Sequence, residues 1–133
     1  MQTFELQDAW QRTISDHDKN ELTTLFKKTQ PREKESITCI PYRLAYNHRQ
    51  ELLCTVLIHN TKDSSVDIGR ATVQLLHQNS IVANHDFHFS LQLDKKTSMP
   101  WTYIFPKKSY ESSLSVELVR NIEVILLAHT IHN

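Results

Sequence analysis

Glycine is almost missing from this chain, since Gly69 is the only glycine in 133 residues. The Walker phosphate loop and the dinucleotide-binding loop each need several glycines, because the backbone must approach the phosphates closely. Nucleotide binding through either of these loops is therefore excluded.

Cysteine is scarce as well, and Cys39 and Cys54 are too few for a disulfide framework. If the segments on either side of residues 46–51 pair as a hairpin, Cys54 falls opposite about residue 43, well away from Cys39. Both lie in apolar strand contexts, where a thiol tends to be inert rather than nucleophilic. We therefore expect two reduced, buried thiols in a cytoplasmic protein, and no Cys–His catalytic pair.

Net charge and long apolar runs are also lacking. Fifteen basic residues balance fifteen acidic ones, so the chain has no electrostatic signature for nucleic acid or for an anionic membrane. The longest apolar run, "VILLA" at 124–128, is far shorter than the roughly 18 residues of a membrane span. The first 22 residues have no basic region followed by an apolar one. We therefore expect no secretory signal, no membrane insertion and a cytoplasmic location.

The first thirty residues have the apolar spacing of helices. Ser15 is placed to cap a helix, and Asp18 stands three residues later, as in a capping box. Within that helix Leu22, Leu25 and Phe26 form one apolar stripe at i, i+3 and i+4. We expect this stripe to pack on the chain's own sheet.

From residue 37 the apolar period changes to two, which indicates strands. In "ELLCTVLIHN" (51–60) both alternating faces are largely apolar, and the second carries Leu53 and Leu57, as in a central strand covered on both sides. Pro41 in the preceding strand indicates an edge position or a bulge. In "IVANHDFHF" the alternation places Ile81 and Phe87 on the same face.

The chain is therefore predicted to be mainly β. We expect an antiparallel β-sandwich, loosely immunoglobulin-like, with one or two N-terminal α-helices packed on a sheet. The predicted organisation is a helical segment at 1–30, a charged linker at 31–36 and a β-sandwich at 37–133, which together form one compact unit.

The stretch "SMPWTYIFPKKSY" holds an aromatic strand between two prolines. Trp101, Tyr103 and Phe105 alternate, so they point to one side together, and their large area would dominate a small core. Pro100 and Pro106 cannot donate to a ladder and suit an edge strand.

His85 and His88, with Asp86 between them, are the histidines that come nearest to a metal site. Residues three apart on a strand point to opposite faces, so this pair shares a metal only across a bulge or turn. His59 and His77 come from other strands, and no spacing requires them to approach. Zinc sites usually have tighter ligand patterns. We therefore expect no metal, no cofactor and no catalytic residue.

Two carboxylate pairs, Asp16 with Asp18 and Asp63 with Asp67, fit helix-capping and loop roles better than acid–base chemistry. Lys107–Lys108, directly after the aromatic strand, is interpreted as a solvated strand end.

The segment "SMPWTYIFPKK" resembles the Pro-Trp-x-Phe/Tyr-x-Phe-Pro-Lys signature of the SLAP domain, a small module of Gram-positive bacteria named for an S-layer assembly protein of the accessory Sec secretion system. The "LLCTVLIHN" strand and the "HQNSIVANHDF" hairpin are also similar to that family, and the resemblance runs from about Ser15 to Tyr110. It implies no catalytic residues. Trp101, Phe105 and Pro106 match the signature, and with Tyr103 we interpret them as fold-determining.

These patterns lead to one main functional hypothesis and two alternatives. The main hypothesis is a non-enzymatic protein-interaction module, linked by the resemblance to accessory Sec-dependent export or to S-layer and cell-envelope assembly. Its protein partner is not identified by the sequence, and the secretion machinery is one candidate. The alternatives are a small histidine-using metal-dependent hydrolase and a purely structural homo-oligomer. The candidate partner face consists of Leu22, Leu25, Phe26, Leu53 and Leu57.

Overall fold

The computed structural model describes residues 2–30 and 36–128. The elements follow in the order β1 (Thr3–Phe4), α1 (Asp8–Thr13), α2 (Asp16–Lys28), β2 (Ile37–Tyr46), β3 (Leu52–Asn60), β4 (Val66–Ile68), β5 (Ala71–His77), β6 (Ser80–Phe87), β7 (Leu91–Leu93), β8 (Thr97–Phe105), the 3₁₀ helix η1 (Val116–Asn121) and β9 (Ile122–Ala128). The prediction of a mainly β chain with N-terminal helices is confirmed. The linker predicted at 31–36 lies, apart from Ser36, outside the described residues.

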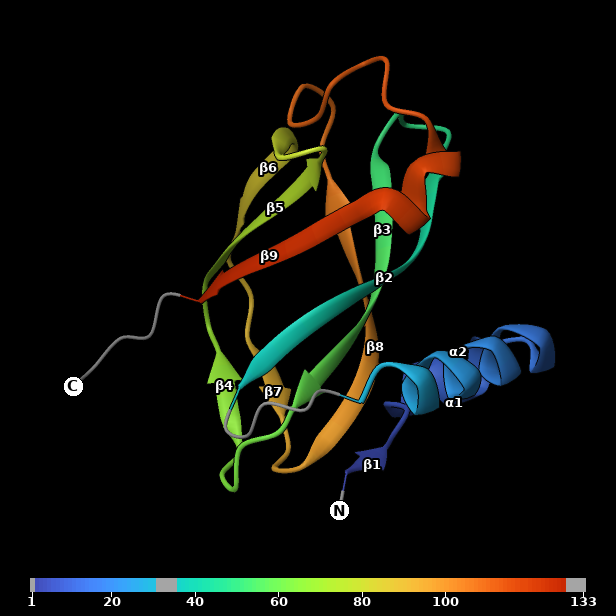
Figure 1. The fold of residues 1–133 in the computed structure, drawn as a ribbon, viewed down its shortest axis with the longest axis vertical. Helices are drawn as coiled ribbons and strands as arrows, with labels where there is room; N and C mark the ends of the chain where they lie inside the picture. Colours follow the sequence, from blue (N-terminus) through green and yellow to red (C-terminus); the bar gives the residue numbers. More distant parts are fainter. Residues whose placement is uncertain (1, 31–35, 129–133) are drawn as a thin grey trace.

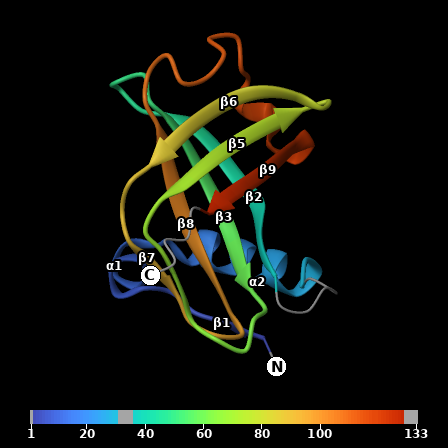
Figure 2. The same cartoon turned by 90° about the vertical axis from the view of Figure 1, so that its left-hand side faces the viewer.

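Two sheets face each other across one core (Figure 1). The first has the strand order β1-β8-β3-β2 and the second the order β6-β5-β9, while β4 and β7 form a short separate ribbon. All pairs are antiparallel except β1 with β8, which is parallel. Figure 2 shows that α1 and α2 lie outside the first sheet, on the side away from the second. The predicted β-sandwich with helices on one sheet is thus observed, while the immunoglobulin-like topology stays a prediction.

Strand β3 is covered on both faces, as its sequence predicted. Val56 and Ile58 are fully buried in the core between the sheets. Leu57 and His59 point the other way and are also fully buried, because α2 packs on that face. The start of α2 is fixed by the predicted cap, in which the Ser15 side chain accepts a hydrogen bond from the backbone N–H of Asp18.

Strand β2 carries the bulge that Pro41 predicted. It forms the end of the first sheet, and its register against β3 shifts between Pro41 and Arg43. A proline lacks the N–H that a regular ladder needs, so a bulge at an edge strand accommodates it at low cost.

The aromatic strand is β8, and its side chains differ in burial. Tyr103 and Phe105 are fully buried, whereas Trp101 is half-buried and packs against Phe89 with ring centroids 5.6 Å apart. The indole N–H of Trp101 is buried without a hydrogen-bond partner among the described residues. That these residues determine the fold stays a prediction.

Strand β8 is not an edge strand along its whole length, because β1 pairs with its first two residues. The backbone N–H of Glu5 donates to the carbonyl of Ser98, which shows that the backbone groups of Ser98 point toward β1. Alternate residues of a strand point the same way. The nitrogen of Pro100 therefore also points away from β3 and removes no hydrogen bond from that ladder.

The hairpin of β5 and β6 corrects one prediction. Ile81 does not share the buried face of Phe87 but is 52% exposed. The register shifts between Leu75 and Leu76, which pair with Ala83 and Ile81 respectively. One extra residue in β6 reverses the side-chain alternation on one side of the bulge.

Candidate functional site

The predicted partner face is largely an internal contact. Leu22, Phe26 and Leu57 are buried where α2 lies on β3. Leu25 and Leu53 are only half-buried, and Leu25 faces a groove on the other side of α2. The helix is therefore docked on the sheet, and three of the five predicted residues form its contact rather than a free surface.

His59 connects both ends of the N-terminal segment to the first sheet. The hydroxyl of Thr29 donates to the carbonyl of Leu25 at 2.6 Å, so it accepts from Nε2–H of His59 at 3.0 Å. The Nδ1 atom of His59 then accepts from the hydroxyl of Ser98 at 2.6 Å, and that oxygen accepts from the amide of Gln2 at 2.9 Å. Both ring nitrogens are therefore hydrogen-bonded, and in the neutral form of the ring this network places the proton on Nε2.

The surroundings of His59 disfavour its charged form. The side chain is fully buried, its hydrogen-bond partners are neutral hydroxyls, and its other ring contact is Phe26 at 6.3 Å between centroids. Burial lowers the pKa of His59 to about 4, because the imidazolium would lose its hydration. At neutral pH this histidine is therefore uncharged.

A groove of about 530 Å³ runs along the exposed side of α2, and we call it the α2 groove. It is bounded by α2 on one side and by β2 and η1 on the other. Its lining residues are His17, Asn20, Glu21, Thr24, Leu25, Lys28, Pro41, Tyr42, Val119 and Arg120.

The α2 groove combines an apolar floor with charged rims. Leu25, Pro41 and Val119 are half-buried, which leaves part of each side chain open to a ligand. Lys28 and Arg120 are exposed, and within residues 2–30 and 36–128 neither forms an ion pair. Such a mixture is typical of a surface that binds a protein segment, with apolar anchors inside and polar contacts around them.

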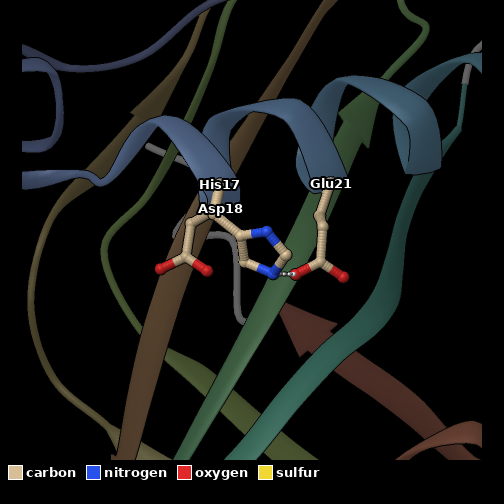
Figure 3. Close-up of side chains that lie close together, drawn as sticks. All are labelled: His17, Asp18 and Glu21. Carbon is tan, nitrogen blue, oxygen red and sulfur yellow. Dashed lines mark ion pairs between the residues drawn. The ribbon is translucent and has the colours of Figure 1, made fainter.

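His17 and Glu21 of the α2 groove form a polar cluster with Asp18 (Figure 3). His17, Asp18 and Glu21 project from the same side of α2, and each offers a ligand atom within 4.8 Å of the other two. Nε2 of His17 lies 2.7 Å from a carboxylate oxygen of Glu21. The carboxylate of Asp18 accepts hydrogen bonds from Arg43 and Tyr42 of β2, and chiefly the Arg43 bond lowers the pKa of Asp18.

The geometry of this cluster suits an ion-paired attachment between α2 and β2 better than a metal centre. The guanidinium of Arg43 lies against the carboxylate of Asp18, so a divalent cation would have to displace a charged partner or lie beside it. The side chain of His17 is 79% exposed, and within the described part of the chain Glu21 is the only residue that holds its ring in place. We therefore assign these residues to the attachment of α2 to β2.

The other histidines predicted as metal candidates do not come together. His85 is half-buried on β6, where its ring meets the edge of Phe87 with centroids 4.9 Å apart, and His88 is exposed beyond the end of that strand. His77 ends β5 in the same sheet. His59 lies on the outer face of the opposite sheet, so the core separates it from the other three.

The carboxylates and thiols singled out in the sequence have structural surroundings. Asp63 lies 3.5 Å from Lys96, and Asp67 accepts from the hydroxyl of Ser90. The two thiols, Cys39 and Cys54, are free and buried, as predicted. Burial raises the pKa of both thiols to about 12, so neither is a thiolate at neutral pH.

Sequence reasoning missed most of the α2 groove. Pro41 was read only as a strand irregularity, and Tyr42, Val119 and Arg120 were not singled out at all. No local pattern joins them to α2, because β2 and η1 reach the helix only through the tertiary fold. Leu25 was the one groove residue with a signal, namely its place in the apolar stripe.

Comparison with known proteins gives one family. A family model described as the SLAP domain matches residues 4–120, a span that contains every lining residue of the α2 groove. No curated protein and no solved structure gives a significant match. Within the described residues, no helix is long and apolar enough to cross a membrane. Since the matched span covers most of the chain and includes the predicted signature strand, the chain belongs to the SLAP domain family.

Proposed function

We propose that this chain is a non-enzymatic protein-interaction module that works in the cytoplasm, in accessory Sec-dependent export or in assembly of the S-layer and cell envelope. Its membership of the SLAP domain family supports that setting. The two free, buried thiols support the cytoplasmic placement. Disulfides form in oxidising compartments outside the cytosol, whereas cysteines stay reduced inside it.

The observation that carries the proposal is the α2 groove. It is a large hollow of about 530 Å³, it has a half-buried apolar floor, and rigid elements form its walls. The bonds from Arg43 and Tyr42 to Asp18, together with the His59 connections, hold α2 in place before any partner arrives. A preformed groove loses little entropy on binding, which favours recognition of a partner segment.

The proposal is tested by affinity capture from the native cell with three forms of the full chain. Leu25→Asp places a charge on the groove floor, whereas Thr23→Asp places the same charge on a half-buried position of the same helix that does not line the groove, and is the matched control. We expect the wild type and Thr23→Asp to capture a component of the accessory secretion or envelope-assembly machinery, and Leu25→Asp to lose it.

If Leu25→Asp captured the same component as the wild type, the α2 groove would not be the surface that binds the partner. Capture of no export or envelope component by any form would contradict the proposed setting. Light scattering of the wild type tests the homo-oligomer alternative, which predicts that the chain associates through an edge strand.

A further inference from the structure

A second hollow lies where the end of β2, the β2–β3 turn and the segment after β8 meet. It measures about 330 Å³ and shares no residue with the α2 groove. We call it the Lys–Tyr hollow, and its lining residues are Tyr46, Asn47, Gln50, Lys107, Lys108, Tyr110 and Ser112.

Two crossed hydrogen bonds fix the walls of the Lys–Tyr hollow. The hydroxyl of Tyr46 donates to the carbonyl of Leu114, and the hydroxyl of Tyr110 donates to the carbonyl of Gln50. The two tyrosine rings pack together with centroids 5.5 Å apart. Each ring is thereby held from its far end, so the hollow is preformed and presents aromatic surface to whatever enters it.

The backbone at Lys108 takes a conformation that lysine disfavours. Residues Pro106 to Ser109 form a turn closed by a hydrogen bond from the N–H of Ser109 to the carbonyl of Pro106, at 3.0 Å. Lys108 occupies the third position with φ 78°, where a type II turn normally has glycine or asparagine. A non-glycine residue held in a strained conformation is a reason to look for a function of its side chain.

The charge of the hollow has one sign. Lys107 and Lys108 are both exposed and adjacent, and within the described ranges neither forms an ion pair with a carboxylate. Two adjacent lysines beside a pair of tyrosines complement a ligand that combines a negatively charged group with an apolar or aromatic group. With no net charge on the chain as a whole, this is a local preference and not a general attraction for polyanions.

We propose that the Lys–Tyr hollow binds an acidic segment of a partner protein, in which a Glu or Asp carboxylate meets Lys107 and Lys108 and a neighbouring apolar side chain packs on Tyr46 and Tyr110. The inference goes beyond the proposed function, because it concerns a different surface and holds whether or not the chain works in export.

The test is a titration of the ¹⁵N-labelled full chain followed by NMR. The probe is the capped peptide Gly-Glu-Glu-Phe-Gly, and its control is the same peptide with both glutamates replaced by glutamine. We expect saturable amide shifts confined to residues 46–51 and 106–112 with the acidic peptide, and weaker binding of the control. The double variant K107Q/K108Q should raise the Kd about tenfold, which corresponds to about 1.4 kcal/mol.

Two further proteins separate binding from folding. The variant K27Q/K28Q removes another adjacent lysine pair, at the end of α2, and should bind the acidic peptide as the wild type does. Lys108→Gly should weaken binding while leaving the thermal midpoint unchanged or higher, because glycine relieves the backbone at φ 78°. A loss of binding accompanied by greater stability separates a role in binding from a role in packing.

The inference is overturned by any of four results: shifts that map to the α2 groove or scatter over all lysines, equal binding of the glutamine peptide, an unchanged Kd for K107Q/K108Q, or an equal loss for K27Q/K28Q. Saturation of the same amides by inorganic phosphate but not by the acidic peptide would also overturn it, by showing a simple anion site.

Discussion

Acid should destabilise this protein through one buried residue, His59. The folded state holds the ring neutral, with its pKa lowered to about 4, against 6.5 for an ordinary histidine. At pH values between these two pKa values, His59 is protonated in the unfolded chain and neutral in the folded chain. The contribution of His59 to stability is therefore fully present above about pH 6.5 and is lost as the pH falls toward 4.

The size of this effect follows from the two pKa values. Linkage gives a loss of about 2 kcal/mol between pH 8 and pH 5, and of about 3 kcal/mol once the pH is below 4. A loss of about 2 kcal/mol is a large share of the stability of a small domain. Asp18 contributes little in this window, because its pKa lies below the ordinary 3.8.

The measurement is urea unfolding at pH 8 and pH 5, followed by tryptophan fluorescence. His59→Gln keeps one donor and one acceptor in the side chain but cannot titrate, so it should lose most of the pH dependence. His77→Gln, at the end of β5, is the matched control and should keep it. Because each protein is compared with itself at two pH values, any constant loss from the substitution cancels.

Two results would refute the reasoning. One is equal stability of the wild type at pH 8 and pH 5. The other is a His59→Gln variant that loses as much stability in acid as the wild type does, which would assign the acid sensitivity to other groups.

Three further predictions follow from the packing. Phe105→Ala should lower the free energy of unfolding by about 3–5 kcal/mol in urea titrations, and Trp101→Ala by less, since Trp101 is only half-buried; the reverse order would show that Trp101 is the main aromatic anchor. Removing residues 1–30 should expose the face of Leu57, so size-exclusion chromatography and a hydrophobic dye should detect association; a monomeric, dye-silent product would mean that the helices cover nothing. Added zinc should leave the thermal midpoint unchanged, because Arg43 already pairs with Asp18; a saturable rise would establish a metal site there.

Local sequence patterns predicted the helices and strands in which buried side chains recur at a regular spacing. The alternation in β3 showed that both faces are covered, and Ser15 with Asp18 located the start of α2. The same logic failed for Ile81, because a bulge in the β5–β6 pairing is set by contacts between strands and leaves no mark on the alternation of one strand. It also missed β1, since a two-residue strand has no period to detect.

Candidate sites were harder to predict than elements. The stripe Leu22, Leu25 and Phe26 was found, but its spacing does not say which member faces the sheet and which faces solvent. The structure buries Leu22 and Phe26 and leaves Leu25 in the α2 groove. Lys107 and Lys108 were interpreted as a solvated strand end, and nothing in the sequence revealed that Tyr46 lies beside them.

The sequence by itself excluded the glycine-rich phosphate loops and indicated the secondary structure that the chain favours. One glycine excludes the phosphate loops, two separated cysteines stay free, and a period-two pattern after residue 37 requires sheets. Only the tertiary structure decided where the two hollows form. Both hollows join segments that lie far apart in the sequence. Such neighbours are fixed by the pairing of β2 with β3 and by the path of the chain after β8, not by the spacing of residues along the sequence.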